Sequence, residues 1–311
     1  MAIFEEDLKY LSKKANDPYF KESFAFYKNC IDIAIKRLKK EFPFFSESDV
    51  QIYIQGSYQN GTMVDELAKL EIVVEFGQNS FATLEKLPKL KISRIWSDEE
   101  DGILVKKRVV SFKPNVHLGI IKKILLESLM AQTGNDGIYN NSKSIYIPAY
   151  KSNKIPCEIL PCYTLNNTPG NESVIIYDAY INKYVAAFPK LHCKNLATKN
   201  EETEGNFIQV VRIFRNIRDI LIKNEVIKDS FAPSYFLECL LYNIPNELYK
   251  GGLSSMILKI LNYLINCNLN DFICAHEQFK MFGNNSDAWT TYKARSFINL
   301  LSNVWEQYEN E

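Results

Sequence analysis

Several long stretches of the chain carry apolar residues at every third or fourth position, a spacing that lines one face of an α-helix. Residues 5–42 show this spacing, for example at Tyr27, Ile31 and Ile35. The same pattern predicts further helices over residues 114–132, 207–224, 233–242, 252–267 and 288–308. From Asn206 onward, the chain is therefore expected to be helical almost without interruption.

Short runs rich in β-branched and aromatic residues occupy much of the first half of the chain and predict strands. These strands are expected over residues 50–54, 69–76, 142–147 and 154–160. The last is expected to end at Pro161, because proline cannot donate to a sheet ladder. Strands and helices followed by helices alone predict an α+β fold: a mixed sheet with helices, followed by a C-terminal helical bundle.

The polar stretch at residues 195–205 separates the mixed half from the helical half and predicts the domain junction. The expected domains are residues 1–200 and 201–311. A cleft between two such domains is a usual place for a ligand.

Composition narrows the classes of function. Hydrophobic residues make up 46% of the 311 residues, which supports a packed globular core. Basic and acidic residues balance at 37 each, so contact with a polyanion would need a local basic cluster. No apolar run is long enough to span a bilayer, and the first residues lack the pattern of a signal peptide. The protein is expected to be cytoplasmic, without a membrane partner.

The seven cysteines are scattered and mostly lie in apolar segments, as reduced core thiols do in cytosolic proteins. Cys267, Cys274 and His276 are close enough in sequence to suggest a metal site, but no Cys-x-x-Cys pair accompanies them. A structural zinc site is therefore not expected.

A glycine-serine turn follows the first predicted strand, in the run Gly56-Ser57-Tyr58-Gln59-Asn60-Gly61-Thr62. Gly56 lets the backbone approach an anion, and the hydroxyl and amide of Ser57 can both donate hydrogen bonds to a phosphate. A Gly-Ser turn alone is a common loop element. Its place between two strands favours phosphate binding.

Acidic residues follow on the second predicted strand. Residues two apart on a strand face the same way, so Lys69, Glu71 and Glu75 are expected on one face. Glu158 lies where a neighbouring strand again alternates. Carboxylates on adjacent strands suit two-metal phosphoryl transfer, because they can hold both cations.

A basic helix face is the third candidate feature. Arg212, Arg215 and Asn216 are three and four residues apart and so share a face, and guanidinium groups suit phosphate oxygens. The alternative is a solvated face that pairs with acids such as Asp219. Lys143 could add another cation.

Taken together and in order, these motifs resemble the bacterial nucleotidyltransferases of the cGAS/DncV-like group, which have a polymerase-β-like palm and a C-terminal helical domain. The similarity covers residues from about 20 to 250. It is carried by the Gly-Ser turn, the strand at residues 69–76, Glu158 before Leu160-Pro161, and the runs Val211-Arg212-Ile213-Phe214-Arg215-Asn216-Ile217-Arg218 and Ala232-Pro233-Ser234-Tyr235-Phe236-Leu237-Glu238.

The resemblance implies binding of a nucleoside triphosphate, and many members of the group act in anti-phage defence. It also implies that Ser234 and Tyr235 contact the nucleoside, with the tyrosine available for base stacking. The expected nucleotide-binding residues are thus Gly56, Ser57, Lys143, Arg212, Arg215, Ser234 and Tyr235.

The catalytic positions depart from the family pattern. Where the family has Asp-x-Asp, this chain has Lys69-Leu70-Glu71, and a third aspartate is replaced by Glu158. A longer carboxylate displaces a metal ligand, whereas a lysine puts a positive charge where a cation should lie. Two like charges about 4 Å apart repel by about 4 kcal/mol at an effective dielectric of 20. Lys69 is expected to pair with Glu71 and Glu158 instead, in a cluster that needs no metal, or to contact a triphosphate.

Three hypotheses follow. The first, which we favour, is a catalytically degenerate protein that binds a nucleotide or oligonucleotide in the interdomain cleft, without a cofactor, and regulates a partner effector protein. The second is an active nucleotidyltransferase that uses Glu71 and Glu158 with Mg²⁺ or Mn²⁺ to make a nucleotide signal, an oligomer or a nucleotide-modified target. The third is a structural subunit that binds another protein. A different strand register, with Asp65 or Glu66 as the acids, is the alternative for Lys69.

Overall fold

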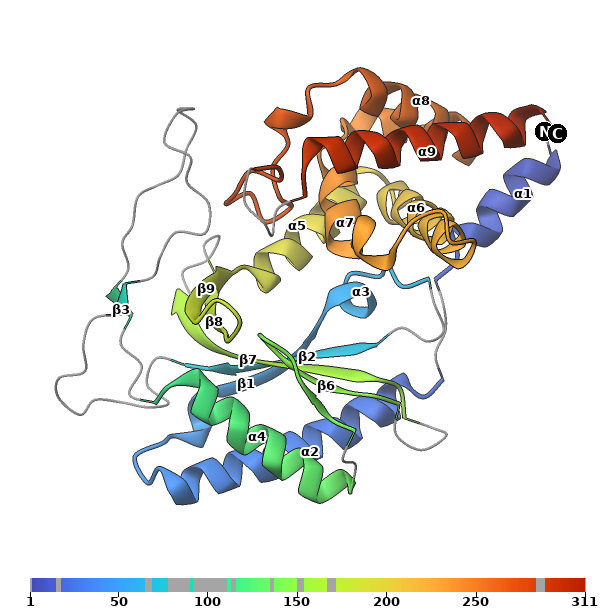
Figure 1. Cartoon of the computed structure of the whole chain (residues 1–311). Helices are drawn as coiled ribbons and strands as arrows, with labels where there is room; N and C mark the ends of the chain where they lie inside the picture. Colours follow the sequence, from blue (N-terminus) through green and yellow to red (C-terminus); the bar gives the residue numbers. More distant parts are fainter. Residues whose placement is uncertain are drawn as a thin grey trace. The chain divides into compact units, whose positions relative to one another are not determined.

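The fold combines a mixed β-sheet with helices and a separate group of helices, so the predicted α+β class is confirmed (Figure 1). The computed structural model describes residues 2–14, 18–64, 69–77, 90–91, 111–112, 116–134, 137–149, 154–166, 172–283 and 289–310. The α-helices are α1 (Ala2–Leu11), α2 (Phe20–Glu41), α3 (Gly56–Gln59), α4 (Leu118–Thr133), α5 (Pro189–Glu202), α6 (Asn206–Lys223), α7 (Ser234–Tyr242), α8 (Leu253–Asn266) and α9 (Thr291–Asn310).

The chain forms two compact units. Unit 1 comprises Met1–Ala15, Gln59–Asp65 and His192–Glu311, and unit 2 comprises Asn16–Tyr58 and Glu66–Leu191. The Gly-Ser motif is divided between them, because its first residues belong to unit 2 and its last residues to unit 1. The division at residues 191/192 differs from the expected boundary at 200/201, since α5 runs through most of the polar stretch that suggested a linker.

Unit 2 contains a sheet of seven described strands, in the order β1-β2-β7-β6-β5, with β8 pairing with β7 and β9 with β8. Within this sheet β2 and β7 are parallel, and the other pairs are antiparallel. The strands are β1 (Val50–Gln55), β2 (Leu70–Phe76), β5 (Tyr139–Asn140), β6 (Ile145–Ile147), β7 (Cys157–Asn166), β8 (Ser173–Asp178) and β9 (Lys183–Ala187); β3 (Leu90–Lys91) and β4 (Ser111–Phe112) pair separately.

One face of the sheet packs against α2 and α4, which lie side by side beneath it in Figure 1. The apolar spacing of α2 buries Tyr27, Ile31 and Leu38 in this core, and the even-numbered residues of β2 enter it from the other side. Residues 71, 73 and 75 consequently point to the opposite face, as the strand pattern predicted.

Glu75 is a buried charged residue on this opposite face, and its carboxylate has hydrogen-bonding and cationic partners. Its carboxylate accepts hydrogen bonds from Tyr53 Oη (2.9 Å) and Thr164 Oγ1 (2.7 Å), and it pairs with Lys190 Nζ at 2.8 Å. The residue is only 1% exposed, so the cost of burying the carboxylate is offset by these contacts. Glu75 therefore has a structural role, although it shares a face with Glu71.

Strand β7 continues past Pro161, where the sequence predicted its end. Pro161 pairs in register with Val74 of β2, while on the other side of β7 the β6 pairing stops at Ile159 and the β8 pairing starts at Tyr163. The missing proline N–H thus falls in a gap between two neighbours, where no ladder bond is lost.

Unit 1 is helical, as predicted. Its core is formed mainly by α6, α7, α8 and α9, with large buried side chains such as Phe207, Phe214, Tyr249 and Phe297. The predicted helix over residues 5–42 is two helices, α1 in unit 1 and α2 in unit 2. The expected starts at residues 114 and 288 lie outside the described residues. Of the helices that the structure describes, none combines the length and apolar character needed to cross a membrane.

The N-terminus of α8 depends on a side chain from α1, which gives a test of this packing. The Glu5 carboxylate accepts hydrogen bonds from the amides of Leu253 (2.8 Å) and Ser254 (3.0 Å) and from Ser254 Oγ (2.8 Å). Desolvation disfavours the charged carboxylate and would raise the pKa of Glu5. The hydrogen bonds from Ser254 and Leu253 outweigh this effect, so the pKa of Glu5 is lowered.

We expect Glu5→Gln to reduce the free energy of unfolding by about 1 kcal/mol, a typical value for a helix cap. Because the pKa is lowered, the stabilisation is present above the ordinary carboxyl pKa and is lost as the pH falls through the folded value. Urea unfolding at pH 7 and pH 3 measures both effects, with Glu6→Gln as the exposed control. An equal loss in both variants at pH 7 would contradict the capping role.

Candidate functional site

The Gly-Ser turn begins where β1 ends, and its geometry requires glycine. Gly56 has φ +75°, which side-chain-bearing residues rarely adopt. A Cβ at this position would lie 2.3 Å from Glu71 Oε2. The turn and the carboxylate therefore lie against each other, as the sequence pattern predicted. Ser57 follows in the first turn of α3.

The two predicted glutamates meet across neighbouring strands. Glu71 on β2 and Glu158 on β7 are direct partners in the parallel register, so both side chains rise from the same face. Their side chains are 28% and 25% exposed, in contrast with the buried Glu75. This pair of accessible carboxylates beside a glycine turn is the candidate site of unit 2.

Lys69 lies at the start of β2 and pairs with both carboxylates, which confirms the predicted ion-paired cluster. Its Nζ is 3.7 Å from Glu71 Oε1 and donates a hydrogen bond to Glu158 Oε2. Desolvation disfavours the ammonium, but the charge of Glu71 and the hydrogen bond to and charge of Glu158 outweigh it and raise the pKa of Lys69. Ser144 Oγ donates to the other oxygen of Glu158. The cluster is thus a set of mutually satisfied groups with a cation built in.

These residues do not fit a pair of divalent cations. Both oxygens of Glu158 are engaged, by Lys69 and Ser144, and the lysine ammonium adds a positive charge beside both carboxylates. Val73, the next residue on the same face, is fully buried and apolar. Asp65 and Glu66, the acids of the alternative register, lie outside the described residues. Within the described part of the chain, no group of three or more His, Cys, Asp or Glu side chains is arranged to hold a metal ion.

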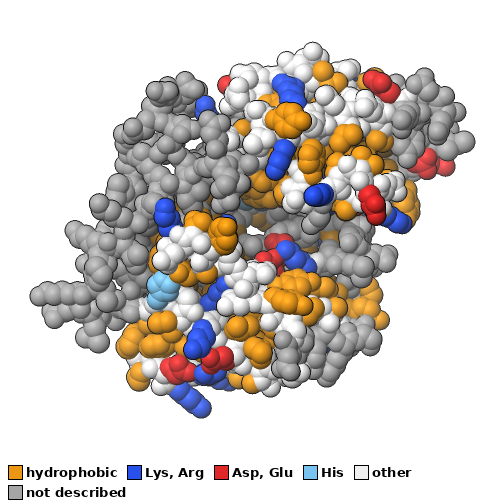
Figure 2. Space-filling view, viewed as in Figure 1, with side chains coloured by type: hydrophobic (Ala, Val, Ile, Leu, Met, Phe, Trp, Pro, Cys, Tyr) orange, Lys and Arg blue, Asp and Glu red, His pale blue; other side chains and the backbone are white. Residues whose placement is uncertain are grey.

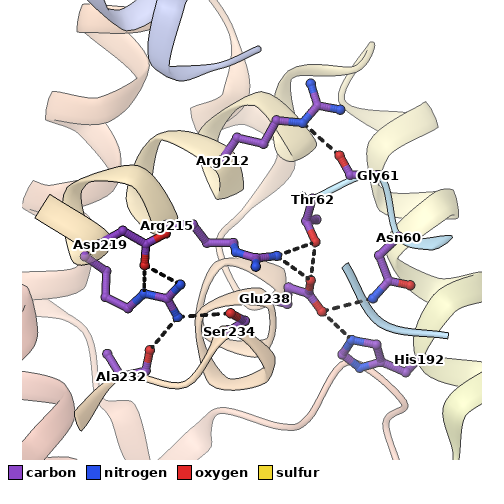
Figure 3. A network of polar contacts seen from close by, with 11 residues as sticks. Asn60, Gly61, Thr62, His192, Arg212, Arg215, Asp219, Ala232, Ser234 and Glu238 are labelled. Atoms are coloured by element: carbon purple, nitrogen blue, oxygen red, sulfur yellow. Dashed lines mark hydrogen bonds and ion pairs between the residues drawn. The ribbon is translucent and has the colours of Figure 1, made fainter. Parts of the chain in front are cut away.

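The predicted phosphate-binding arginines have partners within unit 1 (Figure 3). Arg212 and Arg215 do share a face of α6, as expected from their spacing. Arg212 donates from Nε to the Gly61 carbonyl (2.8 Å) and from Nη1 to the Ser12 carbonyl (3.0 Å). Arg215 is buried and donates to Thr62 Oγ1 at 3.0 Å. The two arginines hold the second half of the Gly-Ser motif, and phosphate binding by them stays a prediction.

Glu238 on α7 is the centre of this network, and the sequence reasoning did not single it out. Its carboxylate accepts hydrogen bonds from Thr62 Oγ1 (2.5 Å) and Asn60 Nδ2 (3.1 Å) and lies 2.8 Å from His192 Nε2 and 3.9 Å from Arg215 Nη1 (Figure 3). Burial alone would raise the pKa of Glu238, but its contacts with His192, Arg215 and Thr62 lower it. The sequence held one signal for this role, because Glu238 is the single acid within the mainly apolar segment of α7.

The remaining predicted contacts are placed as follows. Ser234 Oγ accepts a hydrogen bond from Arg218 Nη1 at 3.0 Å. Tyr235 stacks on His192 with ring centroids 4.8 Å apart, and it is 40% exposed. Lys143 in unit 2 pairs with Asp178 at 3.3 Å.

Most of the cysteines are buried, as the apolar segments around them predicted. Cys267 Sγ donates to the Leu264 carbonyl, and Cys274 Sγ donates to the Lys280 carbonyl. On the face drawn in Figure 2, the described basic and acidic side chains are interspersed, in keeping with the balanced composition.

The Glu238 network supplies a stability prediction. Glu238→Gln keeps the shape of the side chain but removes the negative charge beside the buried Arg215, so we expect a loss of about 3 kcal/mol in unfolding free energy. The lowered pKa means that the wild-type advantage is present at neutral pH and fades as the pH falls below about 4.5. Chemical denaturation across this pH range measures it, with the exposed Glu201→Gln as control. A loss below about 1 kcal/mol at pH 7 would argue against the network.

Comparison with known proteins shows which family the chain resembles. Residues 194–306 match the family model of the cGAS/DncV-like nucleotidyltransferase C-terminal helical domain. The chain is 26% identical to a cyclic UMP-AMP synthase of Rhodothermus marinus, over 82% of this chain and 84% of the relative. It is 28% identical to a cyclic nucleotide synthase of Staphylococcus haemolyticus, over 84% of this chain and 87% of the relative.

Solved structures show the same fold over nearly the whole chain. The CdnE c-UMP-AMP synthase of Rhodothermus marinus, determined with Apcpp and Upnpp, superposes with a TM-score of 0.73 at 22% identity, covering 98% of this chain and 97% of the other. The CdnE cyclic dinucleotide synthase of Elizabethkingia meningoseptica, determined with GTP and Apcpp, gives 0.69 at 23% identity, covering 96% and 98%. Its helical-domain match and its relatives over more than four fifths of the chain, together with the shared fold, identify the chain as cGAS/DncV-like.

Proposed function

We propose that this protein binds a nucleoside triphosphate or an oligonucleotide without catalysing two-metal nucleotidyl transfer, and that binding regulates a partner effector. The observation that carries the proposal is the pairing of Lys69 with both Glu71 and Glu158. The involvement of an effector and a role in anti-phage defence rest on the family resemblance.

Charge balance supports the loss of two-metal chemistry. Three carboxylates of the family pattern would supply three negative charges, whereas two glutamates and one lysine sum to −2 + 1 = −1. Two divalent cations held by this set would keep most of their charge uncompensated, at separations where repulsion amounts to several kcal/mol. The ammonium already supplies the countercharge that a metal would provide.

The same arrangement favours a phosphate ligand. Gly56 lets the turn lie against the Glu71 carboxylate, and Ser57, which follows it in α3, can donate to a phosphate from its hydroxyl and amide. Lys69 is 41% exposed on its side chain, so its ammonium is accessible while it neutralises the neighbouring glutamates. Without this lysine, the two carboxylates would repel a triphosphate.

We expect ATP or another nucleoside triphosphate to bind the wild-type protein with nearly the same affinity in excess Mg²⁺ and in EDTA. Lys69→Met should weaken binding roughly tenfold, because it removes the cation and leaves the negative charge of two carboxylates uncompensated. Isothermal titration calorimetry measures both effects, and Lys183→Met provides an exposed lysine control in unit 2. Binding that requires Mg²⁺, or an unchanged affinity in Lys69→Met, would contradict the proposal.

The second candidate function is an active cyclic nucleotide synthase that uses Glu71 and Glu158 with Mg²⁺ or Mn²⁺. It is favoured by the similarity to cyclic nucleotide synthases over more than four fifths of this chain. The cross-strand pairing of the two glutamates is also compatible with it. For this function, Lys69 would have to leave the carboxylates.

Product formation separates the two candidates. We expect no nucleotide product from the wild type with any mixture of ribo- or deoxyribonucleoside triphosphates and Mg²⁺ or Mn²⁺, and measurable product from a Lys69→Asp/Glu71→Asp/Glu158→Asp variant. Chromatography of the reaction mixtures measures this. Product from the wild type that disappears in Glu71→Ala would establish the synthase instead. The absence of both nucleotide binding and product would point to a structural subunit.

A further inference from the structure

A row of four side chains crosses the sheet of unit 2 from the site to its edge. Glu71 pairs in register with Glu158, Glu158 with Tyr146 on β6, and Tyr146 with Tyr139 on β5. Directly paired residues project from the same face of a sheet, so the two tyrosines continue the line of the two carboxylates. The neighbours of Tyr146 in sequence, at positions 145 and 147, are buried in the core on the opposite face.

The outer tyrosine is unusually open for a large aromatic residue in a sheet. Tyr139 is 60% exposed, and its ring lies 6.2 Å from that of Tyr146, with an angle of 27° between the ring planes. The two rings thus form a nearly parallel aromatic pair at the exposed edge of the sheet. Tyr146 is close enough to Lys69 to contribute to the charge environment that raises its pKa.

The distance between neighbouring strands shows how far this aromatic pair lies from the residues proposed to bind phosphate. Neighbouring strands lie about 4.8 Å apart, so Tyr146 is about one strand spacing and Tyr139 about two strand spacings from Glu158. The ribose of a nucleotide separates its base from its phosphates by a span of this order. A phosphate at Gly56, Ser57 and Lys69 therefore leaves its base within reach of the tyrosines.

We propose that Tyr146 and Tyr139 form a stacking platform for the base of the nucleotide whose phosphates are held by the Gly-Ser turn and Lys69. This inference rests on the proposed nucleotide-binding function and adds the base subsite. The occupant is a nucleobase rather than an apolar segment, because the platform is continuous with a charged cluster and is flanked by the exposed polar residues Asn140 and Asn141. Stacking accepts any base, since every base has a π-face.

Calorimetric titrations with ATP and with inorganic tripolyphosphate test the platform. Tyr139→Ala should raise the Kd for ATP roughly tenfold, within the usual range for the loss of one base-aromatic stack, and leave the Kd for tripolyphosphate unchanged. Tyr139→Phe keeps the ring and should retain the wild-type Kd for ATP. Tyr180→Ala is the matched control, because Tyr180 is an exposed tyrosine of the same unit at the turn between β8 and β9.

The outcomes separate this inference from the function on which it rests. Unchanged ATP affinity in Tyr139→Ala would overturn the platform and leave nucleotide binding intact. An equal loss of affinity for ATP and tripolyphosphate would also overturn it, because stacking cannot act on a ligand without a base. Failure of the wild type to bind ATP would overturn both proposals. Thermal unfolding of each variant checks that the exposed substitution leaves the fold unchanged.

Discussion

The parallel pairing of β2 with β7 is the constraint on which the candidate site depends. It places Glu71 opposite Glu158 and, at the same time, directs Leu70, Ile72 and Cys157 into the core that α2 and α4 cover. A slip of one residue would turn the apolar set outward and the carboxylates inward, at a large cost in burial free energy. The core therefore fixes the register, and the register fixes the site.

Two buried carboxylates serve a different purpose, and their surroundings show why. Glu75 in unit 2 and Glu238 in unit 1 are almost fully buried, and each is surrounded by hydroxyl and cationic partners. Such groups hold segments in place, because removing any partner leaves an uncompensated charge in a poorly solvated position. Glu71 and Glu158 differ from them in remaining partly exposed beside the glycine turn, where a ligand can reach them.

Lys69 reduces the negative charge of the partly exposed pair formed by Glu71 and Glu158. The resemblance to the cGAS/DncV-like group predicts a carboxylate at this position, whereas this chain has a lysine whose ammonium pairs with Glu71 and Glu158. The fold, the turn and the strand pairing do not depend on that position, since Lys69 lies just before β2 and outside the core. The residue type at position 69 can therefore change the charge of the site while the fold stays the same.

Features that depend on neighbours along the chain could be predicted from the order of the amino acids. Helical spacing predicted α2 and α6 to α9, and alternation placed Glu71 and Glu75 on one face. The glycine and serine at the end of the first strand indicated the turn. The pattern of β-branched and aromatic residues also located β1 and β2, because such residues make up most of both strands.

Contacts between groups that are distant in the chain depend on how the strands pair and the helices pack. Strand β7 continues through Pro161 because its neighbours leave a gap there, and α5 includes most of a stretch whose polarity suggested a linker. Arg215 is directed to Thr62 rather than to solvent, and Tyr139 aligns with Glu158 through two strand pairings. Such contacts join residues far apart in the chain, and local propensity contains no information about them until the register of the sheet and the packing of the helices are fixed.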